Sequence, residues 1–219
     1  MNKKLLYLDD VSFIQTDESY NIPAVSEKEK NRFIKKFGKR GWYDGNLIAL
    51  KEIVRQGKSS KIYCGKSSFY DLAISRLTNL QIFPIISVDA VIEVENSIVI
   101  IKRDSNVFDY SNWWDFPAGM VHVGESMESR LFNRINKDTL INPSDVYIKK
   151  RIPFSIILDG TSINFFYYVK YLNSKDKINF FLKNKKNKIV LLEKSKISSF
   201  LKNKKFIFPE ILSDILFRV

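Results

Sequence analysis

The segment from Trp113 to Ile141 constrains the fold of this chain more than any other stretch. Its first half is a short loop containing Pro117, Gly119 and Gly124, residue types that either fix the backbone or let it bend sharply. Its second half predicts an amphipathic helix, because apolar residues recur at three- and four-residue steps over 127–135. The segment therefore predicts a tight loop that leads directly into a helix with one buried face.

This loop and helix resemble the Nudix box of the Nudix hydrolase superfamily, written G-x5-E-x7-R-E-U-x-E-E-x-G-U with U a bulky aliphatic residue. Gly119 and Glu125 match the opening of the box, and the approach over 114–119 is also similar to that of the family. The resemblance covers roughly residues 85–219. It implies an α/β (α+β) fold, a Nudix-like α/β/α sandwich with a mixed sheet, and a diphosphate-containing ligand.

The second half of the box departs from the family pattern. Counted from Glu125, the arginine–glutamate pair of the pattern falls on Asn133 and Arg134, and its glutamate pair falls on Lys137 and Asp138. Family members hold Mg²⁺ or Mn²⁺ on this helical face with several carboxylates, and the metal polarises the attacking water. Here the face carries two cations, which would repel a divalent metal and attract a phosphate directly. A solvated face with an Arg134–Asp138 ion pair explains the same residues equally well.

The candidate site residues follow from this comparison. Glu125 and Asp138 are the candidate catalytic carboxylates, and Asp138 is the candidate metal ligand. We expect Mg²⁺ or Mn²⁺ as the cofactor if the protein is an active enzyme. A basic residue at the end of the second predicted strand often faces the diphosphate in such folds. The candidate ligand and phosphate contacts are Arg103, Arg134, Lys137, Trp114, Phe116 and Gly119.

Four functions are compatible with these residues. The primary interpretation is a protein that binds a nucleoside-diphosphate-type ligand, such as a nucleotide sugar. Metal-dependent pyrophosphohydrolase activity is disfavoured in this interpretation, because most box carboxylates are replaced. The first alternative is an active Nudix-family hydrolase that uses carboxylates outside the standard box, and the second is metal-free chemistry on the same scaffold. The third is a lysine-rich RNA-binding protein, because the formal net charge of the chain is +12 and nearly all of the surplus lies in 170–205.

Composition narrows the partners further. The lysines of Lys183–Lys205 come without a single arginine, the better reader of phosphates and bases, so RNA binding is not favoured. No apolar run is long enough to predict a transmembrane helix, and we expect no membrane partner. Cys64 is the single cysteine and His122 the single histidine, which excludes an internal disulfide and cysteine-rich zinc sites. The expected location is the cytoplasm.

The chain predicts two parts. Residues 1–84 form an N-terminal α+β extension, weakly similar to that of Nudix proteins acting on nucleotide sugars, and residues 85–219 form the Nudix-like domain. Helices are expected over 27–37, 69–77 and 209–217, besides the box helix. Strands are expected over 5–8, 11–14, 47–55, 61–65, 87–94, 98–103, 146–150, 152–158, 163–172, 179–182 and 188–192.

Overall fold

The protein divides into two compact units. The computed structural model describes residues 3–6, 10–19, 28, 31, 35, 47–57, 59–67, 83–105, 110–150, 153–159, 161–175, 177–178 and 189–217. Unit 1 comprises Met1–Ser87, Met120–Met127 and Ile156–Phe165, and unit 2 comprises Val88–Gly119, Glu128–Ser155 and Phe166–Val219.

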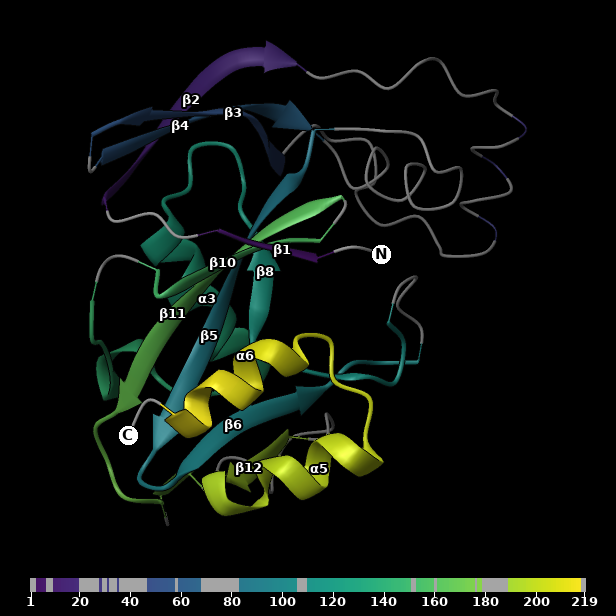
Figure 1. The fold of residues 1–219 in the computed structure, drawn as a ribbon, viewed down its shortest axis with the longest axis vertical. Coiled ribbons are helices and arrows are strands. Elements are labelled where there is room, and N and C mark those ends of the chain that lie inside the picture. The colour runs from purple at the N-terminus through teal and green to yellow at the C-terminus, as the bar shows by residue number, and fades with distance from the viewer. Residues whose placement is uncertain are drawn as a thin grey trace. The chain divides into compact units, whose positions relative to one another are not determined.

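Three long strands of unit 1 are neighbours in the sheet: β2 (Asp10–Ser19), β3 (Leu47–Gln56) and β4 (Ser59–Ser67) (Figure 1). β4 runs parallel to β2 and antiparallel to β3, so strand pairing is mixed. The turn between β3 and β4 places Gly57 at φ +62°, a left-handed conformation that favours glycine.

The remaining strands of unit 1 pair in an antiparallel manner. β1 (Lys3–Leu6) pairs with β10 (Ser155–Asp159), and β10 neighbours β11 (Ser162–Tyr171). β3 joins the first residue of β5 (Ile85–Val94) through Ala49. The apolar residues that these strands bury form the core of unit 1: Leu47, Ile48, Ala49, Ile62, Cys64, Ile85, Ile156, Ile157, Ile163 and Phe165.

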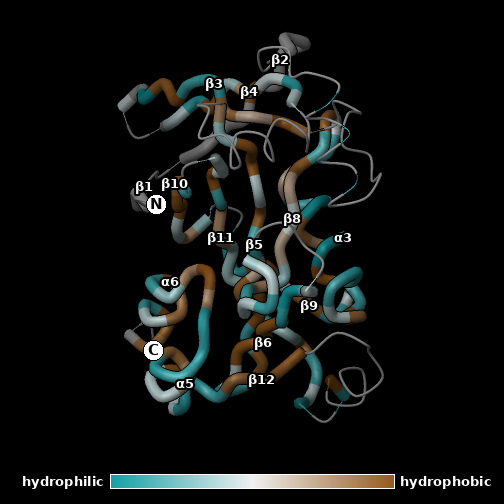
Figure 2. The backbone as a smooth tube through the Cα atoms, turned by 90° about the vertical axis from the view of Figure 1, so that its right-hand side faces the viewer, coloured by the Kyte–Doolittle hydropathy of each residue, from teal (hydrophilic) through white to brown (hydrophobic). Residues whose placement is uncertain are grey.

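Unit 2 is built on the hairpin of β5 and β6 (Ser97–Lys102). The turn of this hairpin contains Glu95 at φ +52°. β6 also pairs antiparallel with β12 (Ile189–Glu193) and with the short strand β7 (Trp114–Asp115), while β9 (Val146–Ile148) pairs with β11. Hydrophobic residues dominate β5 and β6 (Figure 2), as expected for strands whose residues are almost all buried.

The box helix is α3 (Met127–Thr139), preceded by the short strand β8 (Ala118–Met120). Leu131 and Ile135, one turn apart, are its fully buried apolar residues, and Leu140 ends it at φ +63°. The other helical segments are η1 (Pro143–Asp145), η2 (Lys194–Lys196), α5 (Ile197–Asn203), α6 (Pro209–Asp214) and η3 (Ile215–Phe217).

An aromatic layer joins the C-terminal segment to the sheet of unit 2. The segment around Phe206 adds a parallel bridge to β7, because Trp114 N donates to Lys205 O and Ile207 N donates to Trp114 O. Phe116 and Phe206 pack edge to face with ring centroids 5.0 Å apart, and Phe208 packs in the same way on Phe166 at 5.0 Å. Such contacts add to the free energy gained by burying the rings.

The predicted fold class is confirmed, since the chain has a mixed sheet with helices. The strands predicted over 47–55, 61–65, 87–94, 98–103 and 163–172 appear within a few residues of their expected ends, as do the box helix and the C-terminal helix. The strand expected over 5–8 lies at 3–6 instead. Lys28, Asn31 and Lys35 are helical, while the rest of the helix predicted over 27–37 lies outside the described residues, as do 69–77 and 179–182. The boundary between 84 and 85 remains a prediction.

Candidate active site

The first half of the site lies on the β6–β7 pair of unit 2. Lys102 pairs with Trp114, and the ladder continues because Arg103 N donates to Trp113 O at 2.9 Å. Directly opposed residues share a face of the sheet, as do residues two apart along a strand. Arg103, Trp113 and Asp115 therefore share one face. In agreement with this geometry, Arg103 Nη1 donates to Asp115 Oδ2 at 3.2 Å.

Asp115 is a buried carboxylate whose charge is only partly compensated. Its side chain is 4% exposed, against 27% for Arg103, and its Oδ1 accepts a hydrogen bond from Phe116 N at 2.8 Å. Burial raises the pKa of Asp115, Arg103 and the Phe116 N–H lower it, and the negative charge of Asp138 raises it again. The net effect raises the pKa to about 6.

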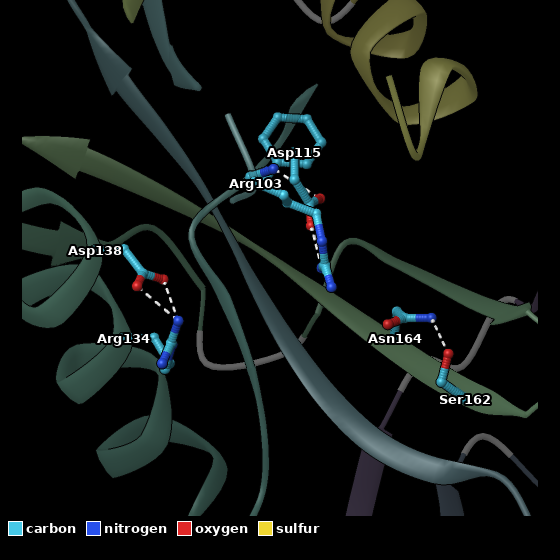
Figure 3. Close-up of polar contacts among 7 residues, drawn as sticks. Arg103, Asp115, Arg134, Asp138, Ser162 and Asn164 are labelled. Atoms are coloured by element: carbon cyan, nitrogen blue, oxygen red, sulfur yellow. Dashed lines mark hydrogen bonds and ion pairs between the residues drawn. The ribbon is translucent and has the colours of Figure 1, made fainter. Parts of the chain in front are cut away.

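The second half of the site is an ion pair on α3. Arg134 and Asp138 are four residues apart, and Arg134 Nη2 lies 2.6 Å from Asp138 Oδ1 and 2.7 Å from Oδ2 (Figure 3). The Arg134 side chain is 20% exposed and that of Asp138 11% exposed. The pair weighed in the sequence analysis is present, but it is largely buried rather than solvated.

Gly119 in β8 makes room for this ion pair. A β-carbon on Gly119 would lie 2.4 Å from Arg134 Cδ, 2.6 Å from Cγ and 2.9 Å from Nε. Distances below 3.0 Å are essentially never seen for a real Cβ, so Arg134 could not keep its position beside any other residue. The glycine that opens the box thus provides the space in which the arginine lies.

The described side chains around Asp138 do not fit the divalent metal that the Nudix resemblance implies. Both oxygens of Asp138 are already bonded to Arg134. Among the residues that the structure describes, no three His, Cys, Asp or Glu side chains group together in a way that could hold a metal ion. Mg²⁺ prefers six oxygen ligands in near-octahedral geometry, and an arginine offers none.

The other predicted site residues are placed differently. Glu125 belongs to unit 1, where its Oε2 accepts from His122 N at 3.3 Å and its N donates to His122 O at 3.0 Å, so it stabilises the loop. Lys137 is exposed on α3. Phe116 is fully buried in the aromatic layer, and we do not retain it among the ligand contacts. Trp114 lies on the face opposite Asp115 and packs on Phe200 with ring centroids 5.6 Å apart.

Trp113 is the residue that sequence reasoning missed. It shares a face with Arg103 and Asp115, whereas the adjacent Trp114 points the other way. Side chains alternate between the two faces of a strand. If the register of β7 against β6 had been known, this alternation would have placed Trp113 on the face of Arg103 and Asp115.

Three lysines of the lysine-rich segment are paired with acidic side chains. Lys177 contacts Asp145, and Lys196 contacts Glu193. Lys194 contacts Glu93, which also binds Lys149. Burial raises the pKa of Glu93, but the hydrogen bonds and charges of these two lysines outweigh it, and the net shift is downward. Such pairing weakens the attraction of these three lysines for an anionic partner, while the lysines over 183–188 lie outside the described residues.

No helix in the described part of the chain is both long and apolar enough to cross a bilayer.

No family model matches the chain. Over 64 residues the chain is 34% identical to the ADP-ribose pyrophosphatase of Methanocaldococcus jannaschii. The matched segment is 29% of this chain and 37% of that protein.

Two solved structures also match part of the chain. A mutT/nudix family protein from Listeria innocua is 18% identical with a TM-score of 0.45, and the match covers 60% of this chain and 92% of that one. A bifunctional NMN adenylyltransferase/ADP ribose pyrophosphatase from Francisella tularensis is 14% identical with a TM-score of 0.46, covering 68% and 46%.

Proposed function

We propose that this protein binds the diphosphate group of a nucleoside-diphosphate-type ligand directly through arginine, without a divalent metal. The observation that carries the proposal is the Arg134–Asp138 pair, which puts a guanidinium where the resembling enzymes would place a metal-binding carboxylate. The local match to an ADP-ribose pyrophosphatase supports the same ligand class, since ADP-ribose contains a nucleoside diphosphate. Metal-dependent pyrophosphate hydrolysis is not part of the proposal, because Asp138 is the single carboxylate among residues 134, 137 and 138 and both of its oxygens already accept from Arg134.

Arg134 keeps hydrogen-bonding capacity for a phosphate. A guanidinium has five N–H donors, and the bonds to Asp138 use Nη2 alone. Its Nε lies beneath Gly119 and finds no hydrogen-bond partner within the described part of the chain, so Nη1 is the donor group that we assign to the ligand. Because arginine binds phosphate through directional, charge-assisted bonds, a fixed guanidinium is well suited to this role.

The two aspartates act as positioning groups in this proposal. Asp138 and Asp115 each hold one partly exposed arginine in place, which lowers the side-chain entropy lost when a ligand binds. The four charges of the two pairs cancel, so the two pairs add little long-range attraction for an anion. We therefore expect modest affinity, with a Kd on the order of micromolar.

A binding experiment in EDTA tests the proposal. Isothermal titration with ADP, ADP-ribose, a UDP-sugar and inorganic pyrophosphate should show binding of at least one of them to the wild type. Binding should weaken at least tenfold in Arg134→Gln/Asp138→Asn, which removes both charges and leaves no buried charge unpaired. Lys202→Gln, an exposed change on α5, is the matched control and should bind like the wild type.

Two results would contradict the proposal. The first is an absence of binding by the wild type to every one of these ligands in EDTA. The second is turnover of a nucleoside diphosphate derivative that depends on Mg²⁺ or Mn²⁺ and is abolished by EDTA, which would favour an active hydrolase with its metal ligands elsewhere.

A further inference from the structure

Trp113 lies next to the arginine of the first ion pair. It is directly opposite Arg103 on the β6–β7 ladder, and it shares a face with Asp115. All three belong to unit 2. A flat aromatic ring and a partly exposed guanidinium therefore occur side by side on one face of the sheet.

The ring of Trp113 has further aromatic and cationic neighbours. Its centroid lies 5.3 Å from that of Tyr110, with the ring planes at 58°, and Lys205 Nζ lies 5.4 Å from the ring centroid. Trp113 and Tyr110 are half-buried and Lys205 is exposed. A half-buried tryptophan between cations is a favourable place for a flat, electron-rich ring attached to an anion.

An unusual turn holds this ring in place. Trp113 N donates to Tyr110 O at 3.1 Å, and both Tyr110 and Asn112 have positive φ angles, +46° and +63°. Asparagine tolerates this conformation, but it is rare for a residue as bulky as tyrosine. Backbone conformations of this kind are frequent at ligand-binding sites, where the surrounding structure maintains them.

We propose that Trp113, flanked by Tyr110 and Lys205, is a subsite for the base of the ligand. The base stacks on the exposed part of the Trp113 ring, beside the cations of Arg103 and Lys205. This inference rests on the proposed binding of a nucleoside diphosphate and assigns the residues that would recognise the base of that ligand. Stacking on an aromatic side chain tolerates any base, because every base presents a π-face.

The experiment compares a ligand with a base and one without it, both in EDTA. The wild type should bind ADP at least tenfold more tightly than inorganic pyrophosphate. Trp113→Leu should lower the affinity for ADP about tenfold and leave that for pyrophosphate unchanged. Tyr147→Leu, which removes an exposed aromatic side chain from β9 of the same unit, is the matched control and should change neither affinity.

Intrinsic fluorescence gives a second measurement that does not depend on the leucine variant folding. ADP should quench the tryptophan emission of the wild type, and Trp113→Phe should abolish most of the quenching while keeping most of the affinity, since phenylalanine also stacks. Quenching that persists in Trp113→Phe would overturn the inference.

The remaining outcomes separate the two proposals. Equal affinities of the wild type for ADP and pyrophosphate would overturn the base subsite and leave diphosphate binding intact. An equal loss of both affinities in Trp113→Leu would show that Trp113 only supports Arg103, which also overturns the subsite. Failure of both ligands to bind the wild type would overturn the proposed function and the subsite with it.

Discussion

Replacing Gly119 with alanine should displace Arg134 from Asp138. The new Cβ would lie 2.4 Å from Arg134 Cδ, so the arginine side chain must move and the ion pair must open. Opening a buried pair typically costs about 3–5 kcal/mol, which we reduce to about 2–3 kcal/mol because the Arg134 side chain is 20% exposed and rehydrates when it moves. Alanine also lowers the conformational entropy of the unfolded chain, which stabilises the folded protein by about 0.4–1 kcal/mol. The net expectation is a loss of about 2 kcal/mol.

A double-mutant cycle in urea isolates this effect. All three atoms nearest to the added Cβ belong to Arg134, so in an Arg134→Ala background the Gly119→Ala change should no longer destabilise, and the protein should gain about 0.4–1 kcal/mol. Unfolding is followed by tryptophan fluorescence, since Trp113 and Trp114 lie in the same unit as the ion pair. In the Arg134→Ala background, Asp138 lacks its partner both with and without the Gly119→Ala change. The free-energy cost of the lost ion pair therefore cancels in that comparison. An equal cost of Gly119→Ala in both backgrounds would refute the assignment of Gly119 as the space for Arg134.

Three further predictions concern titratable groups. Because the pKa of Asp115 is raised to about 6 in the folded state, its contribution to stability is complete below about pH 4 and is lost as the pH rises through 6. In urea titrations, Asp115→Asn should therefore gain stability relative to the wild type between pH 4 and 6, and a flat difference would contradict the shift. The pKa of Glu93 is lowered, so Glu93→Gln should cost about 1 kcal/mol at pH 7, a cost that disappears as the pH falls through that lowered value. Burial raises the pKa of Cys64 to about 12, so a thiol reagent at pH 8 should label no cysteine in the native protein and one in denaturant.

Much of the architecture follows from local patterns in the sequence. Seven of the ten residues of β5 are apolar, and α3 has its buried residues at helical spacing. Turn residues such as Gly57 mark the ends of the long strands. The short strand β7 was not predicted, because two residues are too few to show a period, and its existence depends on hydrogen bonds to β6 and to the distant Lys205.

The site was predictable in composition but not in geometry. The spacing of Arg134 and Asp138 allowed an ion pair from the start, whereas their burial depends on β8 and on the absence of a side chain at Gly119. Choosing Trp113 instead of Trp114 would have required the register of β7 against β6, which is fixed by tertiary contacts. Local sequence therefore identified the chemical groups, and tertiary structure determined which of them face each other.

The two residues that match the opening of the Nudix box, Gly119 and Glu125, both have a packing role in this chain. Gly119 accommodates the side chain of Arg134, and Glu125 accepts a hydrogen bond from the backbone of the loop at His122. Each of these two roles is fulfilled without a metal ion. A metal at Asp138 would lie beside the positive charge of Arg134, one helical turn away, and it would gain only a single carboxylate ligand in return. The opening Gly-x5-Glu of the box is thus explained by the packing of the loop against the helix. The residues at 134, 137 and 138 determine which charge the helix can bind.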